Sequence, residues 1–362
     1  MKLKNIAIAF LGALLFATCS KKDDEKEYTA EESKAVVRST MDNFYNCLQN
    51  LNDGGFANFF HDLLFKETVR DHQGETQSWG NFLGEKFDKQ DFAEGLTEGD
   101  RFNYHRMKGT YTWNKNTELW EKTANNENVT FIFPATKGAT NNGKLVIDQY
   151  EDTETTYGND KVYLPTAAHL YATIDNTKVF EVTVKNVTFE KKTNFTMPLS
   201  AHISIYTNPF TTTIQWNRQN PENFVFDFAF SSPQGCTTGL HADIKLTTSD
   251  YGNISSLEKA IDKIAFTATQ GELRIVGNID VKSLEEKGND RKLRVEEINT
   301  YAKAVLMKGN SKIADVKYEE ENDKGVIYFI FSDGSREKAE KYVSDFEDRV
   351  TQIFKRFERK NN

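Results

Sequence analysis

Apolar and polar residues in the first hundred positions recur with the period of an amphipathic helix. Thr29 and Glu32 have the spacing of a capping box, which begins a helix, and Gly54-Gly55 ends it. Two shorter helices are predicted around residues 56–64 and 79–87. The apolar residues of the first helix recur at spacings of four and three, which places them on one helical face: Val37, Met41, Phe44, Leu48 and Leu51.

From Gly109 onward the period of the pattern is that of a strand. Tyr111 and Trp113 alternate with threonines, residues 114–116 form a turn, and a second strand follows, so a hairpin is predicted. Similar strands joined by short turns continue to Thr247. This succession is typical of an antiparallel meander and not of βαβ units.

Two places interrupt the alternation. The acidic residues 148–160 are predicted to form a solvated loop, because they lack the carboxylate spacing of a calcium-binding loop. At Lys185-Asn186 the apolar positions change phase by one residue inside a continuous strand, which predicts a β-bulge.

The last third of the chain returns in part to helical spacing. Helices are predicted around residues 257–264 and 292–307, and strands at 313–318 and 326–331. A terminal helix carries one apolar stripe: Val343, Phe346, Val350, Ile353 and Phe357. The predicted fold class is α+β. A long curved antiparallel sheet, either a meander or a half-barrel, lies between an N-terminal helical segment and a C-terminal αββα segment.

The first two dozen residues have the pattern of a secretory signal. Lys2 and Lys4 precede an apolar run at residues 6–17, and a polar tail follows Cys19. As a helix this run would span about 18 Å at about 1.5 Å per residue, which is less than the ~30 Å hydrocarbon core of a bilayer. We therefore do not expect it to span a membrane.

Residues 15–19, Leu-Phe-Ala-Thr-Cys, resemble the lipobox of bacterial lipoproteins. The resemblance implies that the chain is cut before Cys19 and that this cysteine carries lipid such as palmitate. The acidic run at 22–25 is similar to the export signal of some surface-exposed Bacteroidetes lipoproteins. Residues 111–113, 133–134 and 163–165 are also similar to lipoproteins of that phylum. These resemblances imply an outer-membrane protein, lipid-anchored and facing the cell surface.

The elements and the signal together divide the chain into five predicted segments. These are a signal peptide at 1–18, a flexible tether at 19–28, a helical segment at 29–108, an antiparallel β domain at 109–280 and the αββα segment at 281–362.

Composition narrows the possible partners. The net charge is −8, and removing the two lysines of the signal brings the chain to −10. Binding to a phosphate backbone requires clustered basic residues, so we expect no nucleic-acid partner. The chain contains 27 Phe and 14 Tyr but only 6 Pro, which favours extended sheets.

Two cysteines remain if Cys19 carries lipid. Cys47 and Cys236 can pair in an oxidising compartment, but only if their Cα atoms approach to roughly 4.4–6.8 Å, which the sequence does not show. We expect two separately buried thiols, with a disulfide as the alternative.

The sequence contains no recognisable catalytic motif. No two of its six histidines have chelating spacing, and neither a nucleophile elbow nor a phosphate-binding glycine loop is present. We therefore expect no metal, no cofactor and no enzymatic activity, with a hydrolase as the minor alternative.

Aromatic residues are the best candidates for ligand binding. Each of them can also belong to the core, but a row of large rings on a concave sheet face can form an apolar groove. The candidates are Trp113, Trp216, Phe224, Phe226, Phe228 and Phe230. At the level of architecture alone, the pattern resembles half-barrel lipid carriers.

The predicted function is that of a non-catalytic envelope lipoprotein that binds an apolar or glycan ligand. The alternative is an accessory lipoprotein that partners other envelope proteins.

Overall fold

The computed structural model describes residues 26–70, 76–90, 92, 97–98, 101–157, 160–191, 196–254, 257–289, 291–344 and 346–357. The predicted signal peptide, Cys19 and most of the predicted tether lie outside the described residues. No helix within the described ranges is both long enough and apolar enough to cross a bilayer.

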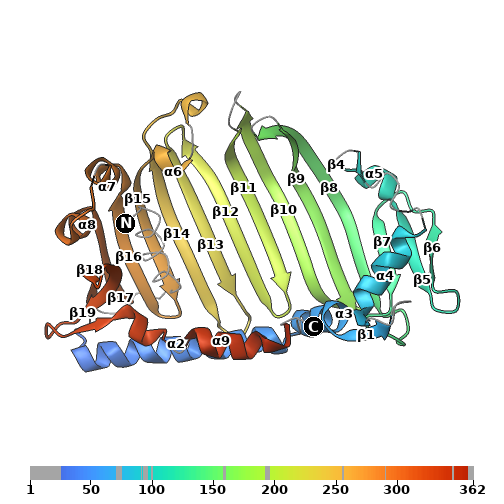
Figure 1. Ribbon diagram of the computed structural model, residues 1–362, viewed down its shortest axis with the longest axis horizontal. Coiled ribbons are helices and arrows are strands. Elements are labelled where there is room, and N and C mark those ends of the chain that lie inside the picture. The colour runs from blue at the N-terminus through green and yellow to red at the C-terminus, as the bar shows by residue number, and fades with distance from the viewer. Residues whose placement is uncertain are drawn as a thin grey trace. The chain divides into compact units, whose positions relative to one another are not determined.

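Most strands belong to one open sheet, and the predicted α+β class with a long antiparallel sheet is confirmed (Figure 1). The hydrogen-bonded order of its 16 strands is β20-β19-β18-β17-β16-β15-β14-β13-β12-β11-β10-β9-β8-β7-β5-β6. The sheet is mostly antiparallel, but β5 and β7 pair in parallel. The chain divides into two compact units, residues 1–48 with 213–351 and residues 49–212 with 352–362.

The first unit holds the C-terminal strands and the greater part of helix α2 (Ala30–Asp53). Its strands are β13 (Asn223–Ser231), β14 (Thr237–Leu246), β15 (Ile261–Gln270), β16 (Leu273–Asp280), β17 (Ala302–Lys308), β18 (Ser311–Glu321), β19 (Lys324–Ile330) and β20 (Arg336–Lys338). Its other helices are η1 (Tyr251–Asn253), α6 (Leu257–Ala260), α7 (Val281–Gly288), α8 (Val295–Tyr301), η2 (Ala339–Tyr342) and most of α9 (Phe346–Phe354).

One face of β14–β19 forms the core of the first unit. Val37 of α2, Leu284 of α7 and Ile298 of α8 belong to the same buried cluster as the inward-facing strand residues. Among these strand residues, Phe266 is 5% exposed and Leu306 is 1% exposed. Helices therefore cover the apolar face here, and burying it supplies the main stabilising free energy.

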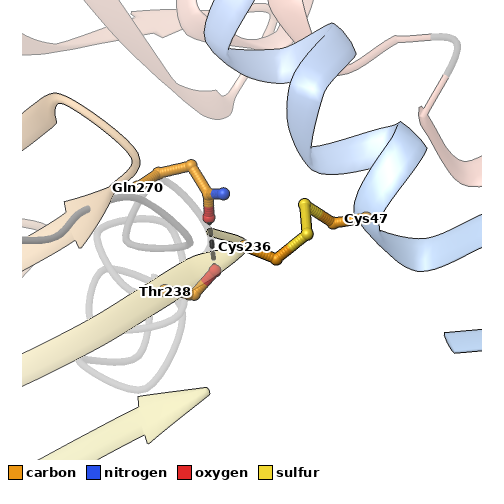
Figure 2. The surroundings of a disulfide bond; sticks show 4 residues. All are labelled: Cys47, Cys236, Thr238 and Gln270. Atoms are coloured by element: carbon orange, nitrogen blue, oxygen red, sulfur yellow. Dashed lines mark hydrogen bonds between the residues drawn. A yellow bond between two sulfur atoms is a disulfide. The ribbon is translucent and has the colours of Figure 1, made fainter. Parts of the chain in front are cut away.

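A disulfide fixes α2 to the segment between β13 and β14 (Figure 2). The Cα atoms of Cys47 and Cys236 are 5.7 Å apart, and Figure 2 shows the bond beside the hydrogen bond from Thr238 to Gln270. The expectation of two separate thiols was therefore wrong. The pair closes across 189 residues of sequence, a separation over which no local pattern predicts proximity.

The second unit holds the N-terminal strands of the sheet, part of β12 (Phe210–Asn220), and the helices α3 (Gly55–Leu64), α4 (Trp79–Asp88), α5 (Tyr104–Met107) and η3 (Lys355–Phe357). The sheet strands are β5 (Gly109–Asn114), β6 (Leu119–Thr123), β7 (Val129–Phe133), β8 (Gly143–Tyr157), β9 (Asp160–Ile174), β10 (Thr177–Lys191) and β11 (Thr196–Thr207). Two small hairpins pair β1 (Glu67–Arg70) with β2 (Thr76–Ser78) and β3 (Thr97–Glu98) with β4 (Arg101–Phe102).

Aromatic rings build the core of the second unit. Trp79 of α4 meets Trp113 of β5 edge to face at 5.8 Å, and Phe87 of α4 meets Trp120 of β6 at 6.1 Å. The indole N–H groups are satisfied, since Trp79 donates to the carbonyl of Pro134 and Trp120 to that of Leu83. Large rings with bonded polar atoms can therefore be buried without an unpaired donor.

Several predicted elements are confirmed. The three N-terminal helices, the hairpin of β5 and β6, and the succession of antiparallel strands lie where the periodicity placed them. The predicted bulge is also present, because the register of β10 shifts between Lys185 and Thr188, and Asn186 has a φ of 56°.

The acidic loop predicted at 148–160 was wrong. Residues 143–157 form β8, which pairs with β9 through the end of the strand. Arg101 bonds Asp152 at 2.8 Å and Lys161 bonds Glu154 at 3.0 Å. Backbone pairing outweighs the low strand propensity of acidic residues, because that propensity depends on context.

The helix predicted at 292–307 was wrong in its second half. The chain forms the short helix α8 and then β17, in which Ala302, Ala304 and Leu306 face the core with period 2. Likewise, α6 ends at Ala260, where a longer helix was predicted, and the terminal helix begins only at Phe346. Sheet pairing overrides the helix propensity of Ala, Leu and Met.

Candidate functional site

The six aromatic residues predicted to bind a ligand do not form one site. Trp113 is 3% exposed within the aromatic core of the second unit. Trp216 stacks on Phe224 with ring centroids 4.9 Å apart, and Phe224 is 1% exposed. Trp113 and Phe224 thus have almost no surface to offer a ligand.

The other phenylalanines of β13 do share one face. Phe226, Phe228 and Phe230 pair in register with Ala242, Leu240 and Thr238 of β14. All three are half-buried, and Phe226 packs against the cluster that α2, α7 and α8 cover. This face of β13 continues the core of the first unit.

The sheet of the second unit has a different character in β9–β11, where apolar and polar residues separate onto two faces. Directly paired residues of antiparallel strands point to the same side. Glu181 of β10 pairs with Tyr171 of β9 and with Tyr206 of β11. Thr183 likewise pairs with His169 and with Ser204. With the next pair, Lys185 and His202, these residues make up what we call the polar face of β9–β11.

The apolar face of β9–β11 carries the alternate positions. Its members are Leu170, Ala172, Phe180, Val182, Val184, Ile203 and Ile205. Phe56 of α3 stacks on Phe180 at 5.2 Å, and Ala172 is buried. The remaining side chains of this face are half-buried, and none belongs to the two buried clusters of the described residues.

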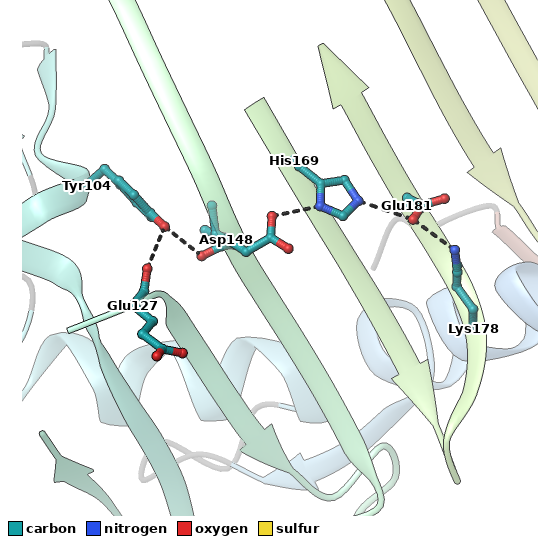
Figure 3. Close-up of polar contacts among 7 residues, drawn as sticks. Tyr104, Glu127, Asp148, His169, Lys178 and Glu181 are labelled. Atoms are coloured by element: carbon teal, nitrogen blue, oxygen red, sulfur yellow. Dashed lines mark hydrogen bonds and ion pairs between the residues drawn. The ribbon is translucent and has the colours of Figure 1, made fainter. Parts of the chain in front are cut away.

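His169 is the centre of a charged chain across the polar face (Figure 3). Its Nδ1 lies 2.7 Å from Oδ1 of Asp148, and its Nε2 lies 3.2 Å from Oε1 of Glu181. Lys178 donates to the same Glu181 oxygen at 2.8 Å. Figure 3 shows these four side chains following one another from β8 across β9 to β10.

A bulge in β8 positions Asp148 toward this histidine. The register with β9 shifts between Ile147 and Gln149, so Asp148 is the extra residue. The phenol of Tyr104 lies 3.2 Å from the Ile147 carbonyl and 3.4 Å from that of Glu127 (Figure 3). Through these contacts, Tyr104 of α5 holds the backbone next to the bulge in place.

The surroundings of His169 favour its charged form. Burial by itself lowers the pKa of His169, but the hydrogen bonds and charges of Glu181 and Asp148 outweigh burial and raise that pKa above its usual value. Burial opposes ionisation of Glu181 as well, yet Lys178 and His169 lower the pKa of its carboxyl. With His169 protonated, the four groups carry two positive and two negative charges.

A second histidine in the first unit has similar surroundings. Nδ1 of His241, on β14, lies 2.6 Å from Asp227 of β13, and its Nε2 lies 3.5 Å from Asp243. The hydrogen bond with Asp227 raises the pKa of His241. Its side chain is 48% exposed, whereas that of His169 is 28% exposed, so solvent screens the first-unit cluster more strongly.

The contacts of His169 occupy both of its ring nitrogens. Both ring nitrogens are bonded to carboxylates, so neither is free to accept a proton from a nucleophile. Among the described residues, no group of three His, Cys, Asp or Glu side chains has an arrangement that could hold a metal ion. The polar face carries tyrosine rings, hydroxyl groups and charged side chains.

No protein-family model matches this chain, and neither a curated protein nor a solved structure resembles it at a significant level.

Sequence reasoning missed the polar face although part of the signal was visible. Glu181, Thr183 and Lys185 alternate with the apolar residues that the periodicity identified in β10. Their partners were not visible, because Asp148 was placed in a loop and register is not readable from one strand.

Proposed function

We propose that this protein is a non-catalytic binding protein of the cell envelope and that it holds a glycan on the polar face of β9–β11. One observation carries the proposal: Tyr171 and Tyr206 flank Glu181 in direct register on three adjacent strands. With neighbouring strands about 4.8 Å apart, the two tyrosine strands are separated by roughly 10 Å, so their rings flank a strip of sheet along which a sugar chain can lie.

The chemistry of these side chains matches that of a sugar. The rings of Tyr171 and Tyr206 are half-buried and provide apolar surface for the C–H faces of sugar rings. Thr183 and Ser204 supply hydroxyl groups, and Glu181 supplies a charged acceptor for sugar hydroxyls. A strand surface that presents such groups in rows suits an extended polymer.

The cellular setting is proposed from the N-terminal signal. The lipobox-like junction supports lipid attachment at Cys19 and an outer-membrane, surface-facing location. The Cys47–Cys236 disulfide supports an oxidising compartment, since such bonds are rare in reducing cytosol. A Cys19→Ala protein is expected to lose labelling by a palmitate analogue and to leave the membrane fraction, and unchanged labelling would contradict lipid attachment.

The glycan proposal is tested by affinity electrophoresis in gels that contain single polysaccharides. Tyr171→Ala and Tyr206→Ala are each expected to weaken binding roughly three- to tenfold, as the loss of an aromatic contact of ~0.5–1.5 kcal/mol predicts. Tyr45→Ala is the matched control, because Tyr45 is half-buried on α2 beneath Arg349 and lies in the first unit. Failure of every polysaccharide to retard the unaltered protein would reject a glycan ligand.

The apolar face of β9–β11 favours a second function, that of an accessory lipoprotein with a protein or apolar partner. Leu170, Val182 and Ile205 lie side by side in register and remain half-buried. Apolar area outside a core is a feature of interaction surfaces. If Val182→Lys abolishes co-purification of an envelope protein and leaves polysaccharide binding unchanged, this function is the one supported.

A further inference from the structure

The polar face of β9–β11 ends in two basic side chains. Lys185 and His202 pair directly in register, two positions along the strands from Thr183 and Ser204. Lys185 is exposed and His202 is half-buried. Lys185 is also the last residue before the β-bulge, so its place on this face is fixed by the bulge at Asn186.

These two basic groups differ from the others on the same face. Lys178 and His169 are bonded to carboxylates, as described above. Within the described ranges, no carboxylate lies within 4.0 Å of a basic nitrogen of Lys185 or His202. Their donors are therefore available to a ligand.

The local charge is balanced on a chain whose net charge is −8. With His169 protonated, Lys178, His169 and Lys185 contribute three positive charges. Asp148, Glu181 and Glu151, which pairs with Ala167 on the same side of the sheet, contribute three negative ones before His202 is counted. Asp148 and Glu181 are already bonded to cations, so they repel an approaching anion less than free carboxylates do.

The spacing fits an oligosaccharide that lies along the strands. Tyr206 and His202 are four residues apart on β11, which corresponds to roughly 13 Å at about 3.3 Å per residue. A sugar stacked on Tyr206 would place a later sugar unit beside Lys185 and His202, with Ser204 and Thr183 between them. Beyond this end, the hydroxyls of Thr188 and Ser200 bond each other at 2.7 Å.

We propose that the ligand is an acidic glycan, and that Lys185 and His202 bind a carboxylate or sulfate on a sugar unit while Tyr206 stacks on another. This inference rests on the proposed function and specifies its ligand class. Charge-assisted hydrogen bonds to the anionic group give the preference over neutral polymers.

The test compares polymers that share a backbone and differ in charge. Polygalacturonate is paired with its fully methyl-esterified form, and dextran sulfate with dextran, and each is titrated against the purified protein in a buffer of fixed ionic strength. We expect at least one charged member to bind roughly tenfold more tightly than its neutral partner. The pair that shows the difference distinguishes a carboxylate ligand from a sulfate ligand.

Variants test whether Lys185 and His202 cause the preference for charged polymers. Lys185→Gln with His202→Gln is expected to reduce the preference by roughly three- to tenfold, whereas Lys185→Arg retains it. Lys303→Gln is the matched control, since Lys303 is an exposed strand lysine of β17 in the first unit. A Lys303→Gln effect equal to that of the double variant would mean that general charge attraction explains binding, and would overturn the inference.

The outcomes separate the two proposals. If neutral and charged polymers bind equally and the tyrosine variants weaken both, the glycan function stands and the acidic specificity fails. If no polymer binds, both fail. If charged polymers bind but the double variant is unaffected, the assignment to Lys185 and His202 is wrong.

Discussion

Strands β14–β19 of the first unit and β9–β11 of the second have the same alternation of apolar and polar residues but different burial. In the first unit, Phe266, Ile275 and Leu306 are buried in a cluster that helices α2, α7 and α8 share. In the second unit, Leu170, Val182 and Ile205 on the apolar face of β9–β11 remain half-buried outside the buried clusters. Alternation therefore predicts that one face is apolar, but it does not predict what covers that face.

The contrast separates stabilisation from binding. A covered face contributes free energy of folding in proportion to the apolar area removed from water. A sheet region with accessible faces contributes less but leaves surface for partners. The edge strand of an open sheet can also pair with another chain, and charged side chains oppose such pairing. At one edge of this sheet, strand β20 carries the charged residues Arg336 and Lys338.

The largest expected effect is the difference in stability loss between two leucine truncations, one on each face. Leu306→Ala, at a site with 1% exposure, is expected to lower the free energy of unfolding by about 2–5 kcal/mol. Leu170→Ala, on the apolar face of β9–β11, is expected to cost ~1 kcal/mol because its side chain is only half-buried. Urea titration of both variants measures the difference. Equal losses would mean that the two faces are equally packed.

The next effect concerns the disulfide of the first unit. Replacing Cys47 and Cys236 together by Ala is expected to reduce stability by about 2–4 kcal/mol, because the bond restricts a long loop in the unfolded chain. Adding reductant to the unaltered protein should lower its urea midpoint by a similar amount, whereas the double variant should not respond. A response of the double variant to reductant would assign the effect to something other than this bond.

An element could be predicted from the sequence where its structure is decided by neighbouring residues of the chain. The helix at Ala30–Asp53 and the bulge at Lys185-Asn186 were predictable, because capping, period and phase are properties of neighbouring residues. The strand at Ala302–Lys308 was misjudged, because its partners on β16 and β18 decide its state.

The candidate site was harder to predict because it needs register across strands. Tyr171, Glu181 and Tyr206 come together only through the pairing of β9, β10 and β11. The disulfide likewise joins two residues, Cys47 and Cys236, that lie far apart in the sequence. Conversely, the conspicuous aromatic residues Trp113 and Phe224 are buried, in keeping with the strong tendency of large rings to supply core area.

The smallest expected effect is a pH dependence that compares the two histidine clusters. A folded-state pKa above the unfolded value means that the histidine adds stability at low pH, and this contribution is lost as pH rises through the folded pKa. His169→Gln should therefore lower stability relative to the unaltered protein at about pH 5.5 and have less effect at about pH 8.5. The expected size is about 1 kcal/mol or less, because the cluster is partly exposed.

His241→Gln provides the comparison for that measurement. Its effect should have the same sign and a smaller size, since its imidazole is 48% exposed and more strongly screened by solvent. The lower limit of the window is set by Glu181, whose lowered pKa keeps it charged until the pH falls below the usual range of a carboxyl group. Urea unfolding at both pH values gives the two differences. A His169→Gln effect that grows toward high pH would show that the imidazole is neutral in the folded protein, and that the chain Asp148–His169–Glu181 does not carry the charges assigned to it.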